Sequence, residues 1–301
     1  MLQIKSLQIQ SVLFNNDLSR VIRSIKSIIR AADFAINKGV FDKITLYYGD
    51  GSRDRIFTDA EIDKLNAEFG EYITVKYDYF ESNLGSARGH NRLANLSESD
   101  FIMIINPDIL LAPDTILQLV KPYNYSDNVG IVEAKQLPIE HPKYYHPKTG
   151  ETSWASTACV LIPRNIFREV GGFDADTFFL YCDDVDFSWM VRLKGYRIIY
   201  QPSAVVFHDK TLSINGAWQT SDAEDYYSAE AGLLLAYKWS RLDILNNILQ
   251  YFENSDVTYY QKAAEEFKRR KEAGRLPKQL DVDNKIGEFI DNNYGKMRFS
   301  L

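Results

Sequence analysis

Cysteine and histidine are both scarce in this sequence. Two cysteines, Cys159 and Cys182, and four histidines occur in 301 residues. The two cysteines lie too far apart to form a metal-ligand motif and are too few for a disulfide scaffold, so we expect reduced thiols in a cytoplasmic protein.

Long hydrophobic runs and an excess of positive charge are also missing. The formal net charge is −6, which argues against a nucleic-acid partner because such a surface must be basic to displace counterions from phosphates. The nearest candidate for a membrane span, GLLLAY at 232–237, is far shorter than the ~20 apolar residues required. The N-terminus, MLQIKSLQIQSVLFNN, alternates polar and apolar residues, so we expect a strand at a mature start and no signal peptide.

The composition is that of a globular protein with a sizeable core. Hydrophobic residues make up 45% and charged residues 25% of the chain. This balance argues against disorder over most of the chain. A chain of this length holds either one large α/β domain with an appendage or two ordinary domains.

Short apolar runs alternate with helical patterns along the first hundred residues. We expect strands at 7–14, 43–48, 72–80 and 101–105, with helices from about residue 18, at about 59–69 and after Gly85. This alternation predicts a mostly parallel, Rossmann-like sheet flanked by helices. Ligands of such sheets bind beyond the carboxyl ends of the strands.

Small polar residues follow each of these four strands. They are Asn15 and Asn16, then Asp50, Gly51 and Ser52, then Asn83 and Gly85, and finally Asn106, Pro107 and Asp108. Each is an ordinary turn former when taken singly, but their joint placement favours a ligand site. Asp108, at the end of an apolar strand, suits either a turn or a divalent cation held against a diphosphate.

The stretch from Trp154 to His208 closely resembles the core of family 2 inverting glycosyltransferases of the GT-A fold. The resemblance lies in VGGFD at 170–174, CDDVD at 182–186, a Gly-Tyr pair at 195–196 and the strand that ends at His208. Upstream, Asp50-Gly-Ser, NLGSARGHN at 83–91 and Asn106-Pro-Asp108 resemble the family's nucleotide-binding and DxD motifs. The match runs from about residue 7 to 210, and the order of several motifs makes it specific.

The resemblance implies a sugar donor, a cation and an acceptor. It implies Mn²⁺ or Mg²⁺ bound by Asp108 and His208, although a strand-end histidine bonded to backbone is the alternative for His208. Donor contacts are implied at Phe14, Asn15, Asp50, Ser52, Asn83, Gly85 and Asn106. Gly49 and Asn106 stand where many relatives carry acids; because Asn106 brings no charge, we expect a lower metal affinity. His90 is expected to face solvent.

The acidic cluster separates by helical geometry. If a helix begins at about Asp183, then Asp183 is its N-cap and Asp186 its third residue, a spacing similar to a capping box. Asp184 then points about 100° away from that pair. Asp184 is also the second acid of the family's pair, which the resemblance identifies as the general base, with Asp183 orienting the acceptor or capping the helix. Trp154 is either an acceptor contact or a packing residue.

The sequence predicts a glycosyltransferase domain at 1–215 and a helical extension at 216–301. The nucleotide-binding part spans about 1–108 and the acceptor part about 109–215. The loop after His208, HDKTLSING, is similar to loops that close over the donor in relatives. FKRRK at 267–271, in a charged helix from about Val257, suits contact with an anionic membrane surface, a solvated helix face or an oligomer contact.

These features together predict an inverting glycosyltransferase. It would transfer a sugar, such as rhamnose, galactofuranose, galactose or glucose, from a UDP- or dTDP-sugar to a glycan or lipid-linked glycan of the bacterial surface, at the cytoplasmic face of the inner membrane. A nucleotidyltransferase is the first alternative, but FNNDLSR at 14–20 lacks the Gly-rich basic loop that it needs. An inactive glycan-binding relative is the second, although it would be expected to have lost Asp108, Asp184 or His208.

Overall fold

The computed structural model describes residues 6–70, 73–141, 143–210 and 220–294. Its central sheet has the strand order β3-β2-β1-β4-β8-β6-β9-β5, and β7 pairs with β9 at one side. The strands are β1 Ser6–Leu13, β2 Lys43–Asp50, β3 Ile73–Tyr79, β4 Phe101–Ile105, β5 Ile109–Leu111, β6 Val129–Leu137, β7 Glu151–Thr152, β8 Cys159–Pro163 and β9 Arg197–His208.

One half of the sheet is parallel and the other half is mixed. β3, β2, β1 and β4 are parallel to one another, as the strand and helix alternation predicted. β8 is antiparallel to both β4 and β6, whereas β6 and β9 are parallel. The predicted fold class, a mostly parallel α/β sheet flanked by helices, is confirmed.

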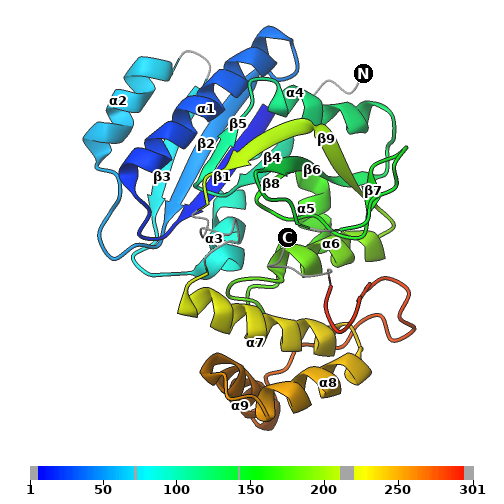
Figure 1. The fold of residues 1–301 in the computed structure, drawn as a ribbon. Coiled ribbons are helices and arrows are strands. Elements are labelled where there is room, and N and C mark those ends of the chain that lie inside the picture. The colour runs from blue at the N-terminus through cyan, green and yellow to red at the C-terminus, as the bar shows by residue number, and fades with distance from the viewer. Residues whose placement is uncertain (1–5, 71–72, 142, 211–219, 295–301) are drawn as a thin grey trace.

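Helices cover both faces of the sheet (Figure 1). They are α1 Leu18–Asn37, α2 Asp59–Phe69, α3 Gly85–Ala94, α4 Thr115–Val120, α5 Arg164–Val170, α6 Asp183–Leu193, α7 Asp222–Lys238, α8 Leu242–Glu253 and α9 Thr258–Glu272, with a 3₁₀ turn at Lys121–Asn124. One hydrophobic cluster contains buried residues of α1, α2 and α4, and another contains those of α3, α5 and α6. The sheet is therefore the middle of three layers.

Helix α1 shows how local sequence determines these layers. The Asp17 side chain accepts hydrogen bonds from the backbone N–H groups of Ser19 and Arg20 and so caps the helix. Val21, Ile25, Ile28, Ala31, Ala32 and Ala35 are fully buried, and their spacing of three or four residues places them on one face. This apolar stripe packs the helix against the strands.

The C-terminal helices α7, α8 and α9 form a further layer below the sheet (Figure 1). They share a hydrophobic cluster with Val185 and Trp189 of α6, and Trp189 packs edge-on against Trp239 with ring centroids 5.3 Å apart. The other face of α6 buries Phe187 and Val191 in the cluster on the sheet. Helix α6 is therefore held between two apolar cores.

Some predictions concern residues outside the described part of the chain. Residues 211–219 contain the boundary predicted at 215 and most of the HDKTLSING loop, and residues 1–5 contain the start of the N-terminus.

In the described part, no helix is both long and apolar enough to cross a bilayer. Lys268 forms an ion pair with Glu253, Arg269 forms one with Glu266 and Arg270 with Glu230, while Phe267 is buried.

Candidate functional site

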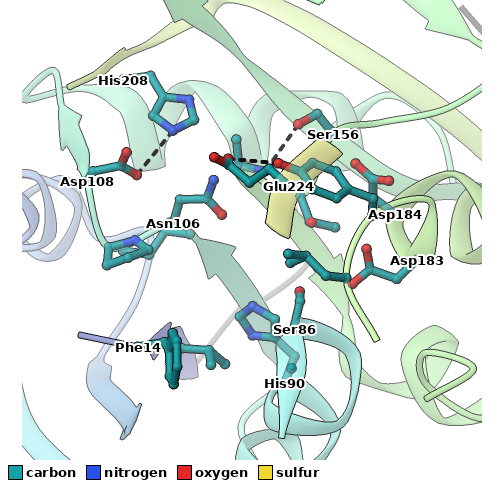
Figure 2. Close-up of a pocket in the computed structure, with 18 of the residues that line it drawn as sticks. Phe14, Ser86, His90, Asn106, Asp108, Ser156, Asp183, Asp184, His208 and Glu224 are labelled. Atoms are coloured by element: carbon teal, nitrogen blue, oxygen red, sulfur yellow. Dashed lines mark hydrogen bonds and ion pairs between the residues drawn. The ribbon is translucent and has the colours of Figure 1, made fainter. Parts of the chain in front are cut away.

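A cavity of about 510 Å³ lies at the carboxyl ends of β1 and β4 (Figure 2). It is the place where ligands of such sheets bind. The predicted residues that line it are Phe14, Asn83, Gly85, Asn106, Asp108, Asp183, Asp184 and His208. The fold thus brings together residues that are nearly 200 positions apart in the sequence.

Asp108 and His208 meet because of the pairing between β5 and β9. In this antiparallel pair Ile109 lies opposite His208, and the backbone N–H of Asp209 donates to the carbonyl of Asp108 at 2.9 Å. As a result, His208 Nε2 lies 3.1 Å from Asp108 Oδ1. The sheet register thus creates the proposed pair of metal ligands.

The electronic state of the His208 ring suits a cation. Its Nδ1 lies 3.0 Å from Gln136 Oε1, and because a carbonyl oxygen only accepts hydrogen bonds, Nδ1 carries the proton. Burial lowers the pKa of His208, although Asp108 opposes this effect. With Nδ1 protonated, Nε2 faces the Asp108 carboxylate and can carry either a second proton, which binds that carboxylate, or a metal ion. Two electron-pair donors so close together repel each other unless a cation or proton lies between them.

The donor set fits a hard or borderline divalent ion. Burial alone would raise the pKa of Asp108, but His208 and Lys210 more than offset this and hold that pKa below its ordinary value. Within the described residues, no group of three or more His, Cys, Asp or Glu side chains is arranged to hold a metal. An ion here would have two protein ligands and would take the others from a diphosphate and water, as Mg²⁺ commonly does.

The acidic pair comes from a strained turn on the opposite side of the cavity (Figure 2). Tyr181 and Cys182 both have positive φ angles, 67° and 54°, which non-glycine residues seldom adopt and which occur often at functional sites. Helix α6 starts directly after them, so Asp183 and Asp184 are its first two residues. Both side chains line the cavity.

The predicted capping role of Asp183 and Asp186 is wrong. Cys182 occupies the N-cap position and makes no side-chain capping bond. Asp186 accepts instead from Lys238 Nζ at 2.8 Å and from Trp239 Nε1 at 2.9 Å. The reason is tertiary, because α7 supplies partners that a local spacing rule does not include.

The two cavity carboxylates differ in environment. Burial, with the neighbouring charge of Asp184 as the second cause, raises the pKa of Asp183 to about 7. Asp183 Oδ2 has no hydrogen-bond partner among the described residues. Asp184 is less buried and its Oδ1 accepts from the N–H of Val185 at 2.9 Å. The site therefore keeps a more accessible carboxylate beside a desolvated one.

The turn at Asn83 and Gly85, which is predicted to contact the donor, lines the cavity. Asn83 Oδ1 accepts from the N–H of Gly85, which has φ +72°. A Cβ atom at Gly85 would lie 2.3 Å from the carbonyl oxygen of Phe179, so only glycine permits this approach. Ser86 N–H also donates to that oxygen at 3.0 Å. The donor loop and the turn before the acidic pair are therefore in direct contact.

Phe14 and Asn106 are placed as donor contacts would be. Phe14 is 49% exposed at the cavity and offers a ring face on which a base could stack. The backbone N–H of Asn106 donates to the carbonyl of Ala158, and its side chain lies near Asp108 (Figure 2).

Three other predicted donor contacts do not line the cavity in the described structure. Asp50 is fully buried, and its carboxylate accepts from the N–H groups of Ser52 and Ile56 and from the hydroxyl of Tyr77. Ser52 Oγ accepts from the N–H of Asn15 at 2.7 Å. In this conformation Asp50, Ser52 and Asn15 shape the loop beside the cavity.

Trp154 is likewise not among the cavity residues. It is 3% exposed; the ammonium of Lys143 lies 4.0 Å from its ring centroid, and the Tyr294 ring packs edge-on at 5.2 Å. The packing interpretation is therefore the one that the structure supports. Lys143 is itself buried against Glu133, which accepts from the N–H of cavity residue Ser156.

The sequence analysis missed several residues that line the cavity. They are Arg20, Ser86, His141, Ser156, Thr157, Tyr181, Lys210 and Glu224, whereas Asn16, named above after the first predicted strand, lines the cavity as expected. Only Glu224 carries a readable local signal, the capping box with Ser221 that starts α7; its Oε1 also accepts from the Tyr181 hydroxyl at 2.8 Å. His90 is 4% exposed and does not face solvent; burial lowers its pKa to about 3.

Comparison with curated proteins gives partial matches. No protein-family model matches the chain. It is similar to N-acetylglucosaminyl-diphospho-decaprenol L-rhamnosyltransferase of Mycobacterium tuberculosis, with 39% identity over 178 residues, covering 44% of this chain and 58% of that protein. It is also similar to poly-beta-1,6-N-acetyl-D-glucosamine synthase of Staphylococcus aureus, with 23% identity over 195 residues, 59% of this chain and 45% of that one. The chain thus spans about half the length of these relatives.

Solved structures agree on the fold. The chain is similar to GalNAc-T7 in complex with UDP, GalNAc and Mn²⁺, with a TM-score of 0.67 and 14% identity, covering 94% of this chain and 57% of that one. It is also similar to a mannosyltransferase from Pyrobaculum calidifontis in complex with GDP-Man and Mn²⁺, with a TM-score of 0.53 and 16% identity. This match covers 92% of this chain and 77% of that one. The chain therefore has the fold of the GT-A glycosyltransferases and is similar to family 2 of these enzymes, as its sequence motifs predicted.

Proposed function

We propose that this protein is a metal-assisted, inverting glycosyltransferase. It transfers a sugar from a UDP- or dTDP-sugar to a hydroxyl group of a growing bacterial surface glycan. One observation carries the proposal: a single cavity has Asp108 and His208 on one side and Asp183 and Asp184 on the other (Figure 2). Direct displacement with inversion needs the leaving group and the base on opposite faces of the sugar.

The residues of the cavity divide into two roles in this proposal. On the donor side, Phe14 stacks on the base, and Arg20 and Lys210 add positive charge beside the diphosphate. Asp108 and His208 would hold a Mn²⁺ or Mg²⁺ ion, which when bound would neutralise the charge of the departing diphosphate.

On the acceptor side, Asp184 accepts the proton of the attacking hydroxyl. The partial exposure of Asp184 lets that hydroxyl approach. The more buried Asp183 lies beside it, so the surroundings of the Asp184 carboxylate are less polar than water. Asp183 holds the acceptor in orientation. Inversion follows because the acceptor enters from the side opposite to the diphosphate.

The setting of the reaction is part of the same proposal. The curated relatives carry names that refer to a decaprenol-linked N-acetylglucosamine and to poly-N-acetylglucosamine, which supports a lipid-linked or polymeric acceptor at the cytoplasmic face of the membrane. Tyr226-Tyr227 is followed by Ser-Ala-Glu, where relatives that act on lipid-linked glycans often have Arg-Asn, and this departure argues against the acceptor mode of those relatives.

A panel of nucleotide sugars tests the donor side. UDP-, dTDP- and GDP-sugars are added with Mn²⁺, with Mg²⁺ or with EDTA, and the unfolding temperature is measured. A true donor at 100 times its Kd adds about 2.7 kcal/mol to the free energy of unfolding. We expect this stabilisation for one nucleotide only, and we expect EDTA to remove it. No shift with any donor would count against the whole proposal.

Substitution of the base tests the acceptor side. Asp184→Asn is expected to keep donor-dependent stabilisation, because the donor contacts are unchanged, and to lower transfer by well over tenfold. Asp176→Asn is the matched control, since the Asp176 side chain is 93% exposed and forms an ion pair with the exposed Arg88. A loss of less than about tenfold in Asp184→Asn would show that another group is the base.

A further inference from the structure

A second cavity, of about 320 Å³, lies between α7, α8, α9 and the segment around Asn292. It shares no lining residue with the first cavity in the described part of the chain. Its volume is at the lower end of the range for small-molecule sites. A ligand of one or two small rings would therefore fit, and the remainder of a longer molecule would extend into solvent.

One wall of this cavity is aromatic and fixed in place. Tyr251 is 61% exposed, and its ring packs against Tyr260 with centroids 5.6 Å apart. Tyr260 in turn stacks on Phe252 at 4.3 Å with an angle of 17° between the rings. Because Phe252 is buried in the helical core, the exposed ring of Tyr251 is held as a rigid platform.

A second part of the lining is formed by side-chain amides of α8 and of a tight turn. Asp291 and Asn292 both have positive φ angles, 49° and 66°, and Ile290 and Asn293 exchange backbone hydrogen bonds of 2.5 and 2.9 Å. This is the geometry of a two-residue type I′ hairpin turn, which is well defined. Asn247 Nδ2 of α8 donates to Asn292 Oδ1 at 3.2 Å, so the two amides lie side by side.

The floor is a face of α7 with small side chains. Asp225, Ser228, Ala229 and Gly232 all line the cavity, and their spacing of three and four residues places them on one side of the helix. A Cβ atom at Gly232 would meet no heavy atom within 4 Å. The cavity therefore exists because this stripe lacks bulk.

The chemistry of the walls favours a neutral sugar. No Lys, Arg or His is among the described residues that line the cavity, so it offers no cation to a phosphate or a carboxylate, and Asp225 would repel one. An aromatic face suits the C–H face of a pyranose, and amides both donate to and accept from hydroxyl groups. The cavity thus offers both aromatic and amide contacts, which suit the apolar faces of a sugar ring and the hydroxyl groups around its edge.

We infer that this second cavity binds neutral sugar residues of the glycan acceptor, at a distance from the transfer site. Neighbouring residues of the first turn of α7 face the two cavities, since Glu224 lines the first and Asp225 the second. A glycan chain bound in both crosses the N-terminus of α7. The inference rests on the proposed function, which makes the acceptor a glycan. It explains how the helical extension contributes to acceptor choice.

Direct binding of neutral trisaccharides tests the inference. Trisaccharides of glucose, of N-acetylglucosamine and of rhamnose are titrated into the full chain, and saturation-transfer NMR measures affinity without any donor. Tyr251→Ala removes the platform. Gly232→Leu fills the cavity, and Leu is favoured over Gly inside a helix, so this variant is expected to fold. Tyr125→Ala is the matched control, because Tyr125 is 84% exposed and lies after α4, away from the cavity.

We expect at least one trisaccharide to bind, with at least tenfold weaker binding to Tyr251→Ala and Gly232→Leu and less than twofold change in Tyr125→Ala. Absence of binding by all three sugars, or binding that survives both cavity variants, overturns the inference. Binding that is lost only in Asp184→Asn places the sugar in the first cavity and also overturns it. Nucleotide-sugar stabilisation does not depend on this cavity, so its persistence would show that the proposed function stands without the second site.

Discussion

Lys238 connects the C-terminal helices to the helix that carries the acidic pair. Its Nζ lies 2.7 Å from Asp174 Oδ2 and 2.8 Å from Asp186 Oδ2. The side chains of Lys238 and Asp186 are 7% and 2% exposed, whereas that of Asp174 is 28% exposed. Replacing Lys238 by Met keeps most of the length of the side chain and removes its charge. Asp186 would then be a buried carboxylate with Trp239 Nε1 as its remaining side-chain donor among the described residues.

The expected cost is large because one charge loses its partner in a buried place. Removing one member of a buried ion pair typically costs about 3 to 5 kcal/mol of unfolding free energy. For a chain of this length, about 2 °C of melting temperature corresponds to 1 kcal/mol, which predicts a decrease of about 6 to 10 °C. The double variant Lys238→Met, Asp186→Asn removes the unpaired charge and should recover at least about 1 kcal/mol.

Urea unfolding of the three chains measures these differences. Lys285→Met is the control, because Lys285 and Asp283 form an ion pair in which both side chains are more than two-thirds exposed, and such pairs contribute at most about 1 kcal/mol. A loss below about 1 kcal/mol in Lys238→Met would refute the reasoning, as would a double variant less stable than the single one. Transfer activity of Lys238→Met should fall as well, since α6 positions Asp183 and Asp184.

Two further predictions concern the cavity itself. Burial raises the pKa of Asp183 from 3.8 to about 7, so between these values the folded state keeps a proton that the unfolded state has lost, and this group makes stability fall as pH rises. From pH 5 to pH 8, the free energy of unfolding of Asp183→Asn, measured by urea titration, should therefore rise relative to that of the unsubstituted chain. If the two free energies change with pH in parallel, the prediction is wrong. Gly85→Ala should cost about 2 to 4 kcal/mol through left-handed strain and overpacking against Phe179, whereas Gly274→Ala, with φ +65° and open space at its Cβ, should cost only about 1 to 2 kcal/mol. Equal losses of stability for Gly85→Ala and Gly274→Ala in thermal unfolding would refute the overpacking argument.

Much of the nucleotide-binding half of the fold could be predicted from local patterns. The helix expected at about 59–69 spans Asp59–Phe69, and the strand at 101–105 spans Phe101–Ile105. These elements follow from period and capping, such as the capping box between Thr58 and Glu61. The antiparallel placement of β8 between β4 and β6 has no local signal, because it depends on pairing between distant strands.

The candidate site could be predicted where a motif carried it and not where packing decided it. Asp108, Asp184 and His208 line one cavity, as the motifs implied. Trp154 carries no signal that separates an acceptor platform from a packing residue, and its burial became visible only with the fold. Asp186 has a partner, Lys238, 52 residues further along the chain, which no spacing rule anticipates.

The sequence by itself determined the class of the sheet, the positions of its first helices and strands, and the residue types at the strand ends. These depend on periodicity, capping and turn chemistry, which act over a few neighbouring residues. Only the tertiary structure decided which of these residues share a cavity and which carboxylate is buried. It also decided that α7 closes one side of the first cavity and forms the floor of a second. Such properties depend on strand register and on the distance between chain segments that are far apart in sequence, and local patterns contain neither.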